Sequence, residues 1–229
     1  MIVDRILRKV KRDLLFRKRL KKAKKLGVAF EEPNYIFINK FDKGATVIDV
    51  GCANDADFSM FVIDTLGLKS IGVDPTRKHH KELAQIRDRS KGKFDFLPYA
   101  VAGSSGSITF HESDNFASGS LIGSHHNMKR DTTTTYEVET VTLSGLLDKL
   151  GMNTAPYIKL DLEGAEYALL SAATKDDLQK FDQIFVEFHH HAFKEYSTDD
   201  TKSLVQKVEN CGFLSFSLDD HNYLFYKKQ

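Results

Sequence analysis

Hydrophobic and polar residues follow two different patterns along this chain. In residues 2–25, apolar side chains recur at steps of three and four and most other positions are lysine or arginine, which predicts an amphipathic helix that ends near Gly27. From residue 34 onward, short β-branched and aromatic runs alternate with helical patterns. This alternation predicts βαβ units and an α/β fold with a mostly parallel sheet.

The order of the predicted elements is regular except in one stretch. Residues 103–142 interrupt the alternation with a hairpin and a Ser/Gly/His-rich loop. The last two strands form another hairpin, so the sheet contains at least one antiparallel strand. Helices are expected at residues 57–66, 77–90, 143–150, 165–173 and 199–211. Strands are expected at residues 35–38, 46–50, 70–74, 94–101, 107–110, 136–141, 157–160, 183–188, 213–218 and 223–226.

Length and composition fit one domain with an appendage, which we divide into an arm (residues 1–27) and a body (residues 28–229). The chain has 229 residues, of which 41% are hydrophobic, so it can form a full core and is not globally disordered. It has no apolar run of membrane-spanning length, and we expect no secretory signal. Two cysteines, Cys52 and Cys211, without a CxxC pair indicate reduced thiols and a cytoplasmic protein.

Charge separates the arm from the body. Residues 1–25 hold 12 of the 33 lysines and arginines and two of the 32 acids, a local charge of +10 that leaves −9 for the rest. Such a helix can lie on an anionic membrane, contact a protein partner or the acidic body, or bind nucleic acid. The apolar stripe favours peripheral membrane binding first and a partner or the body second. Nucleic acid is the least favoured partner, because base stacking needs aromatic side chains and Phe16 is the only aromatic residue before Phe30.

Two residues suggest a nucleoside-type ligand at the carboxyl ends of the strands, where open α/β sheets bind their ligands. Gly51 follows the strand 46–50 and allows a tight turn, and Asp74 ends the next strand, the usual place of an acid that binds ribose hydroxyls. Each alone could also be an ordinary turn or helix-capping residue. No GxGxxG motif is present, so a dinucleotide is less favoured.

Acids also follow the strand 157–160. Lys159, Asp161 and Glu163 would share one side if the strand persisted to residue 163. Two neighbouring carboxylates suit a general base or a hard divalent cation. The alternative is structural, with one acid capping the next helix and the other paired with Lys159.

A second acid and a histidine stand at the next strand end. Glu187 and His189 are two positions apart, which predicts either a base with its orienting partner or, together with Asp161 and Glu163, part of a metal site. A structural role for the histidine is an equal alternative. We interpret the other adjacent histidines as structural or solvent-exposed: His79–His80, His125–His126 and His190–His191.

The body contains the segments VIDVG, IGVDP, SGSL and VTL, and especially IKLDLEGAE, followed by VEFH. Across about residues 34–227, these segments resemble the FkbM-type S-adenosylmethionine-dependent methyltransferases. The resemblance implies a Rossmann-like class I methyltransferase sandwich with a seven-stranded sheet and helices on both faces. One departure is the turn DVGCANDAD, which is one residue longer than the family's usual DVGANxG and has Ala56 in place of the second glycine.

The resemblance also assigns residues and an activity. It implies O-methylation of a hydroxyl on a sugar, glycolipid or secondary metabolite, with a divalent metal as an open question. A catalytically silent binding module and an RNA methyltransferase that uses the arm are the alternatives, and no oligomeric state is favoured. The catalytic residues expected are Asp161, Lys159, Glu187 and His189, and the cofactor-binding residues expected are Asp49, Gly51, Asn54, Asp74, Ser118 and Asp161. Ser118 lies in a Ser/Gly loop that could close over the site.

Overall fold

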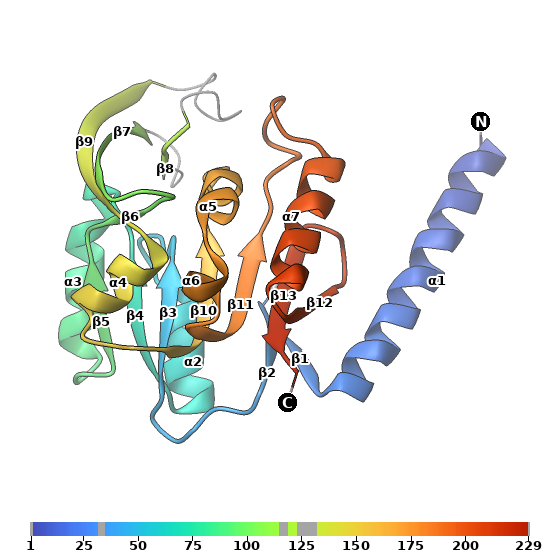
Figure 1. The fold of residues 1–229 in the computed structure, drawn as a ribbon, viewed down its shortest axis with the longest axis horizontal. Coiled ribbons are helices and arrows are strands. Elements are labelled where there is room, and N and C mark those ends of the chain that lie inside the picture. Colours follow the sequence, from blue (N-terminus) through green and yellow to red (C-terminus); the bar gives the residue numbers. More distant parts are fainter. Residues whose placement is uncertain (1, 32–34, 115–118, 123–131, 229) are drawn as a thin grey trace.

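A computed structural model describes residues 2–31, 35–114, 119–122 and 132–228. Its centre is a seven-stranded sheet (Figure 1). The strand order is β12 (Phe213–Ser217), β13 (Asn222–Lys227), β11 (Phe181–Glu187), β10 (Ala155–Asp161), β3 (Thr46–Val50), β4 (Lys69–Val73) and β5 (Phe94–Leu97). Strands β11, β10, β3, β4 and β5 are parallel, whereas β13 is antiparallel to both of its neighbours. The predicted α/β fold, with its mostly parallel sheet and C-terminal hairpin, is confirmed.

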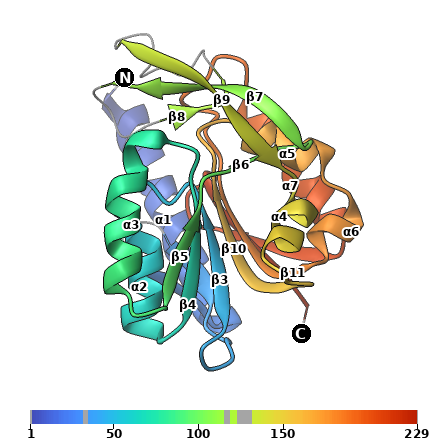
Figure 2. The same cartoon turned by 90° about the vertical axis from the view of Figure 1, so that its left-hand side faces the viewer.

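Helices cover both faces of this sheet, as predicted (Figure 2). One face carries α2 (Asp57–Leu66) and α3 (His80–Arg89), and the other carries α4 (Leu143–Lys149), α5 (Glu166–Ala172), α6 (Lys175–Leu178) and α7 (Thr198–Asn210). Adjacent strand residues serve opposite cores because side chains alternate along a strand. On β10, for example, Tyr157 packs with Phe58 and Phe185, whereas Ile158 belongs to the core under α4–α7.

A second sheet forms from the stretch that interrupts the alternation. Its four strands are β6 (Ala100–Val101), β9 (Thr133–Val141), β7 (Gly106–Ser113) and β8 (Gly119–Ser120). The expected single strand 94–101 is wrong: β5 belongs to the main sheet and β6 to the second one. The break falls at Pro98, which has no N–H to donate to a strand partner. The second sheet lies over the carboxyl ends of the central strands (Figures 1 and 2).

The N-terminal part consists of α1 (Ile2–Leu26) and a small antiparallel sheet of β1 (Val28–Glu31) and β2 (Tyr35–Ile38). Strand β2 does not join the main sheet, but Gln183 bonds the backbone N–H and C=O of Ile38 and the Tyr157 hydroxyl donates to Ile36 O. Most of α1 extends away from the body (Figure 1). Across the described ranges, every helix is too short or too polar to cross a lipid bilayer.

Candidate active site

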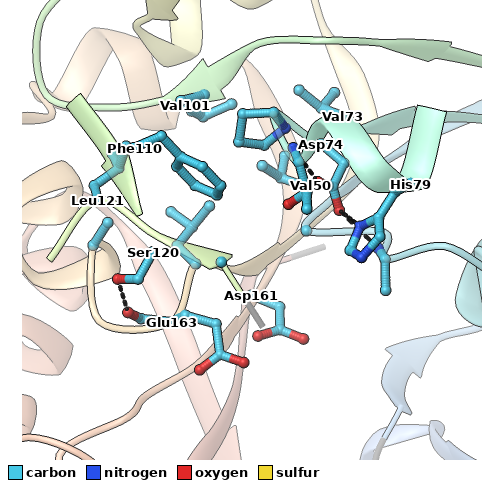
Figure 3. A pocket seen from close by; sticks show the side chains of 18 residues that line it. Val50, Val73, Asp74, His79, Val101, Phe110, Ser120, Leu121, Asp161 and Glu163 are labelled. Carbon is cyan, nitrogen blue, oxygen red and sulfur yellow. Dashed lines mark hydrogen bonds and ion pairs between the residues drawn. The ribbon is translucent and has the colours of Figure 1, made fainter. Parts of the chain in front are cut away.

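A cleft opens where β3, β4 and β10 end beneath the second sheet. It encloses about 720 Å³, including its open mouth. Asp74 and His79 lie on one side of it and Ser120 and Glu163 on the other (Figure 3). Phe110 and Leu121 contribute apolar surface from the second sheet and its neighbouring loop. The residues that line the cleft therefore come from strand ends that the sequence had marked and from the roof, of which the sequence had marked the Ser/Gly loop with Ser120 and Leu121 but not Phe110.

The turn after β3 approaches the end of β10 so closely that only glycine fits. Gly51 has φ 76°, and a Cβ built there would lie 1.9 Å from Asp161 O. The lengthened part of the turn also uses left-handed backbone, with φ 53° at Ala53 and 47° at Ala56. Ala56 thus takes a glycine-like conformation where the family usually has glycine, at about 1 kcal/mol of strain. The departure in sequence leaves the left-handed backbone in place.

Asp74 ties this turn to the end of β4. Its Oδ2 accepts from Ala53 N at 2.9 Å and its Oδ1 from Thr76 N at 2.8 Å. Burial alone raises the pKa of Asp74, but the hydrogen bond and charge of His79 and the bonds from Thr76 outweigh it and lower the pKa. Asp74 is therefore a buried carboxylate at the cleft, with lone pairs left for a ligand.

His79 is the site residue that sequence reasoning missed. It lines the cleft, is 3% exposed, and its Nδ1 lies 3.3 Å from Asp74 Oδ2. Because a carboxylate only accepts, Nδ1 carries the proton in this contact, which leaves Nε2 to bond a ligand. That Nε2 is buried and has no hydrogen-bond partner among the described residues. A ligand group that bonds Nε2 would offset a desolvation penalty of about 1–3 kcal/mol.

At the end of β10, a buried lysine holds two acids. Lys159 Nζ lies 3.1 Å from Asp161 Oδ2, 3.6 Å from Asp49 Oδ1 and 3.4 Å from Gly51 O. Burial lowers the pKa of Lys159, but the charges of Asp161 and Asp49 outweigh it and raise the pKa. Asp49 is fully buried, also accepts from Ser59, and is not among the residues that line the cleft. We therefore see Asp49 as the buried counter-ion of Lys159, and its predicted contact with a cofactor stays a prediction.

Glu163 reaches the cleft by a route other than the one expected. Strand β10 ends at Asp161, so the condition under which strand alternation would place Glu163 beside Lys159 is not met. Glu163 has φ 48°, and Gly164, with φ 98°, packs so tightly on Phe193 that a Cβ would lie 2.5 Å from its ring. The Glu163 carbonyl accepts from Ser120 Oγ at 2.8 Å, which joins β8 to the main sheet.

His189 sits among three carboxylates. Strand β11 ends at Glu187, and beyond it His189 Nδ1 lies 3.2 Å from Glu166 Oε1, while Nε2 lies 3.6 Å from Asp161 Oδ1 and 3.8 Å from Glu163 Oε2. Burial lowers the pKa of His189, but the hydrogen bond and charge of Glu166 and the other two acids raise it to about 10. At neutral pH this histidine is a cation that donates a hydrogen bond to Glu166 and offsets the negative charge of Asp161 and Glu163.

Glu187 has the opposite character. It pairs in register with Asp161 across β10 and β11, and it does not line the cleft. Burial, then the charge of Asp161, raises the pKa of Glu187 to about 7. Its charge therefore changes near neutral pH, directly beside the cleft acid Asp161.

Three side chains come close enough to bind one metal ion. The donor atoms of Asp161, Glu163 and His189 lie within 4.8 Å of one another, and the group does not include Glu187. A metal needs a neutral imidazole, whereas Glu166 and the cleft acids hold the proton on His189, and Lys159 already neutralises Asp161. The cluster therefore fits an internal network of ion pairs better than a site for a divalent cation.

Two further residues predicted to bind the cofactor, Asn54 and Ser118, are not found in the cleft: the first lies elsewhere, and the second is outside the part of the chain that the structure describes. Asn54 is exposed and lines a separate groove between α2 and α3, away from Asp74. Ser118 lies outside the described residues, as do His125 and His126, but its neighbours Gly119 and Ser120 line the cleft. The cofactor roles of Asn54 and Ser118 stay predictions.

Comparison with solved structures yields distant likenesses. The fibrillarin pre-rRNA processing protein of Methanococcus jannaschii is 7% identical, with TM-score 0.49 over 87% of this chain and 81% of its own. A fibrillarin/Nop5p complex is 11% identical (TM-score 0.47, 82% and 75% coverage). TrmK of M. capricolum, solved with S-adenosylhomocysteine, is 10% identical (TM-score 0.44, 83% and 66%). At these values we draw no conclusion on cofactor or substrate from them.

Sequence comparison gives a firmer result. No curated protein matches the chain. Residues 12–215, however, match the model of the Methyltransferase FkbM domain, which spans nearly the whole body and the second half of α1. This chain therefore belongs to the FkbM methyltransferase domain family and is a methyltransferase.

Proposed function

We propose that this protein transfers a methyl group from S-adenosylmethionine to a hydroxyl of a sugar, glycolipid or secondary-metabolite acceptor. The observation that carries the proposal is the composition of one cleft: the Gly51 turn and the Asp74–His79 pair on one side, and the carboxylates Asp161 and Glu163 on the other. The first set of residues can bind a nucleoside, and the second set can accept the proton of a hydroxyl group. When bound, the cofactor supplies a methyl group on a positively charged sulfur that an oxygen nucleophile can attack.

The residues beside Asp74 fit the nucleoside half of such a cofactor. The Asp74 carboxylate can accept from ribose hydroxyls, and His79 Nε2 offers an unpartnered polar atom next to it. Phe110 and Leu121 offer apolar contact for a base. Asp161 and Glu163 leave the rest of the cleft anionic, which favours a cationic group.

The residues at the end of β10 fit the hydroxyl chemistry. Asp161 can accept a hydrogen bond from the acceptor hydroxyl and take its proton as the oxygen becomes nucleophilic. Lys159 and protonated His189 contact Asp161 on separate oxygens and so fix its orientation. Glu187, in register with Asp161, has a pKa of about 7, so its charge changes near neutral pH directly beside the proposed base. Alignment of the hydroxyl and one base suffices for this reaction type.

Two measurements test the proposal. Calorimetry with S-adenosylhomocysteine should show one site per chain, and labelled S-adenosylmethionine should transfer its methyl group to a member of a panel of sugars and glycolipids. Absence of binding at ligand concentrations on the order of millimolar would overturn the cofactor assignment. Binding without transfer to any acceptor would instead favour the silent binding module.

A further inference from the structure

The C-terminal turns of helix α1 pack on the body, whereas the backbone of its N-terminal half, called the free half below, extends away from it (Figure 1). Ala23 is 4% exposed, and Leu20 and Leu26 pack beside it against the core under β2. Arg19 donates to Leu218 O at 2.9 Å and forms an ion pair with Asp220 at 2.6 Å. These contacts fix the C-terminal turns of the helix on the acidic body, which covers the side that carries Ala23 and leaves Lys18 and Lys21 exposed on the other side.

Just before that anchor, the helix carries large apolar side chains that face solvent. Leu14 is 53% exposed, Leu15 47% and Phe16 41%, three of the five exposed large hydrophobic residues in the described part of the chain. Leu14 and Ala23 are nine positions apart, about two and a half turns, so they lie on opposite sides of the helix. The body therefore cannot cover Leu14 while Ala23 stays packed.

Charge indicates what covers this stretch. Residues 1–25 carry a net charge of +10, and Arg17, Lys18, Lys21 and Lys22 are exposed around and beyond the apolar residues. Basic side chains beside exposed leucine and phenylalanine match an anionic lipid surface, which takes both charge and apolar groups. RNA would use the charge alone and leave Leu14 and Leu15 in water.

The direction of the helix agrees with this partner. The free N-terminal end of α1 lies at the same end of the molecule as the carboxyl ends of the central strands in both views (Figures 1 and 2). That is the end at which the cleft is found. A surface that binds the free half of α1 is then reached from the cleft side of the body.

We propose that the free half of α1 binds the surface of an anionic membrane and brings the cleft next to acceptors held there. The second part of this statement rests on the proposed function and selects glycolipids among the acceptor classes named above. The first part stands on the arm alone.

Vesicle flotation of the full-length protein tests the proposal. Binding is expected to vesicles that contain phosphatidylserine, to weaken strongly in high salt, and to be nearly absent with phosphatidylcholine alone. A triple Lys18→Glu, Lys21→Glu, Lys22→Glu variant should lower the partition coefficient by at least roughly 100-fold, since each basic residue near the surface contributes about fivefold. A Leu14→Ser, Leu15→Ser, Phe16→Ser variant should lower it at least about tenfold.

A matched control and defined contrary results complete the test. Leu214→Ser removes another exposed leucine, 43% exposed on β12, and should leave vesicle binding unchanged. The proposal is overturned if wild-type protein stays unbound at low salt, if it binds single-stranded RNA instead and keeps that binding in the apolar triple variant, or if that variant only converts a dimer to a monomer in light scattering. S-adenosylhomocysteine affinity, measured on the same proteins, should not change, so a failure of the cofactor assignment would be seen separately.

Discussion

Two aspartates that line the cleft, Asp74 and Asp161, each contact a histidine, and the surroundings of the two contacts differ. Asp74 and His79 form an isolated pair in which the carboxylate has backbone donors and the histidine keeps one nitrogen unpartnered among the described residues. Asp161 and His189 belong to a larger cluster of charged residues. The imidazole of His189 also contacts Glu166 and Glu163, and Lys159 also binds Asp161.

The number of neighbouring carboxylates decides what each pair can do. Three acids raise the pKa of His189 to about 10 and leave it a fixed cation. His79 faces one acid, and its Nε2 stays available to bond a ligand. We infer that Asp74 and His79 form the recognition side, which binds the nucleoside. Asp161, which is held by His189 and Lys159, forms the side that accepts the proton.

The largest effect is expected from Asp161→Asn. It removes the proposed base but keeps the shape, so kcat should fall by about 10²–10⁴-fold, while the dissociation constant for S-adenosylhomocysteine changes by less than about threefold. Steady-state kinetics and calorimetry measure the two quantities. An equal loss in both would show that Asp161 is part of the recognition side.

Gly51→Ala tests whether the turn after β3 must lie directly against the end of β10. The added Cβ would lie 1.9 Å from Asp161 O, so we expect a loss of at least about 3 kcal/mol in the free energy of unfolding. Gly67→Ala is the matched control, because Gly67 has φ 68° and nothing within 4 Å of an added Cβ. It should lose only about 1–2 kcal/mol of strain. Equal losses in denaturant titrations would contradict the close approach.

His79→Leu probes the recognition side while the Asp74 carboxylate stays in place. Loss of the hydrogen bond at Nε2 should weaken S-adenosylhomocysteine binding about tenfold, and His79→Gln should restore part of it. His80→Leu is a suitable control, since His80 contacts the Asp74 backbone oxygen at 3.2 Å and is not among the residues that line the cleft. If the two leucine variants bind alike, His79 is only structural.

The smallest effect concerns pH and Glu187. Because burial and Asp161 raise its folded pKa to about 7 from an ordinary 4.5, the folded protein holds a proton there that the unfolded chain releases. Its contribution to stability is present at low pH and is lost as pH rises through 7. Between about pH 5 and 8, wild type should therefore lose on the order of 1 kcal/mol more than Glu187→Gln in denaturant titrations. Parallel curves would show that Glu187 is ionised throughout.

The sequence predicts the main sheet and its ligand-binding edge well, because a buried parallel strand is readable from a short β-branched run such as residues 46–50. It does not predict the second sheet, since β6 separates from β5 only through the bend at Pro98 and pairs with β9 about forty positions later.

The candidate site follows the same rule. Asp74, Asp161 and Glu163 are found from their positions at or after a strand, whereas His79 comes back to Asp74 through a short 3₁₀ turn, Arg77–His79, that periodicity does not show. The one available signal was a histidine five positions after a strand-end acid. The fixed charge of His189 depends on Glu166, which is distant in sequence, so no local pattern could assign its protonation.

The central claim is that recognition and proton transfer are separated within one cleft, and Asp74→Ala tests it most directly. Calorimetry with S-adenosylhomocysteine compares this variant with wild type and with Asp161→Asn. Asp74→Ala should bind about 10–100-fold more weakly than wild type, because a charged hydrogen-bond acceptor is lost. Wild type and Asp161→Asn should bind alike. Unchanged affinity in Asp74→Ala, or no binding by wild type, would contradict the account.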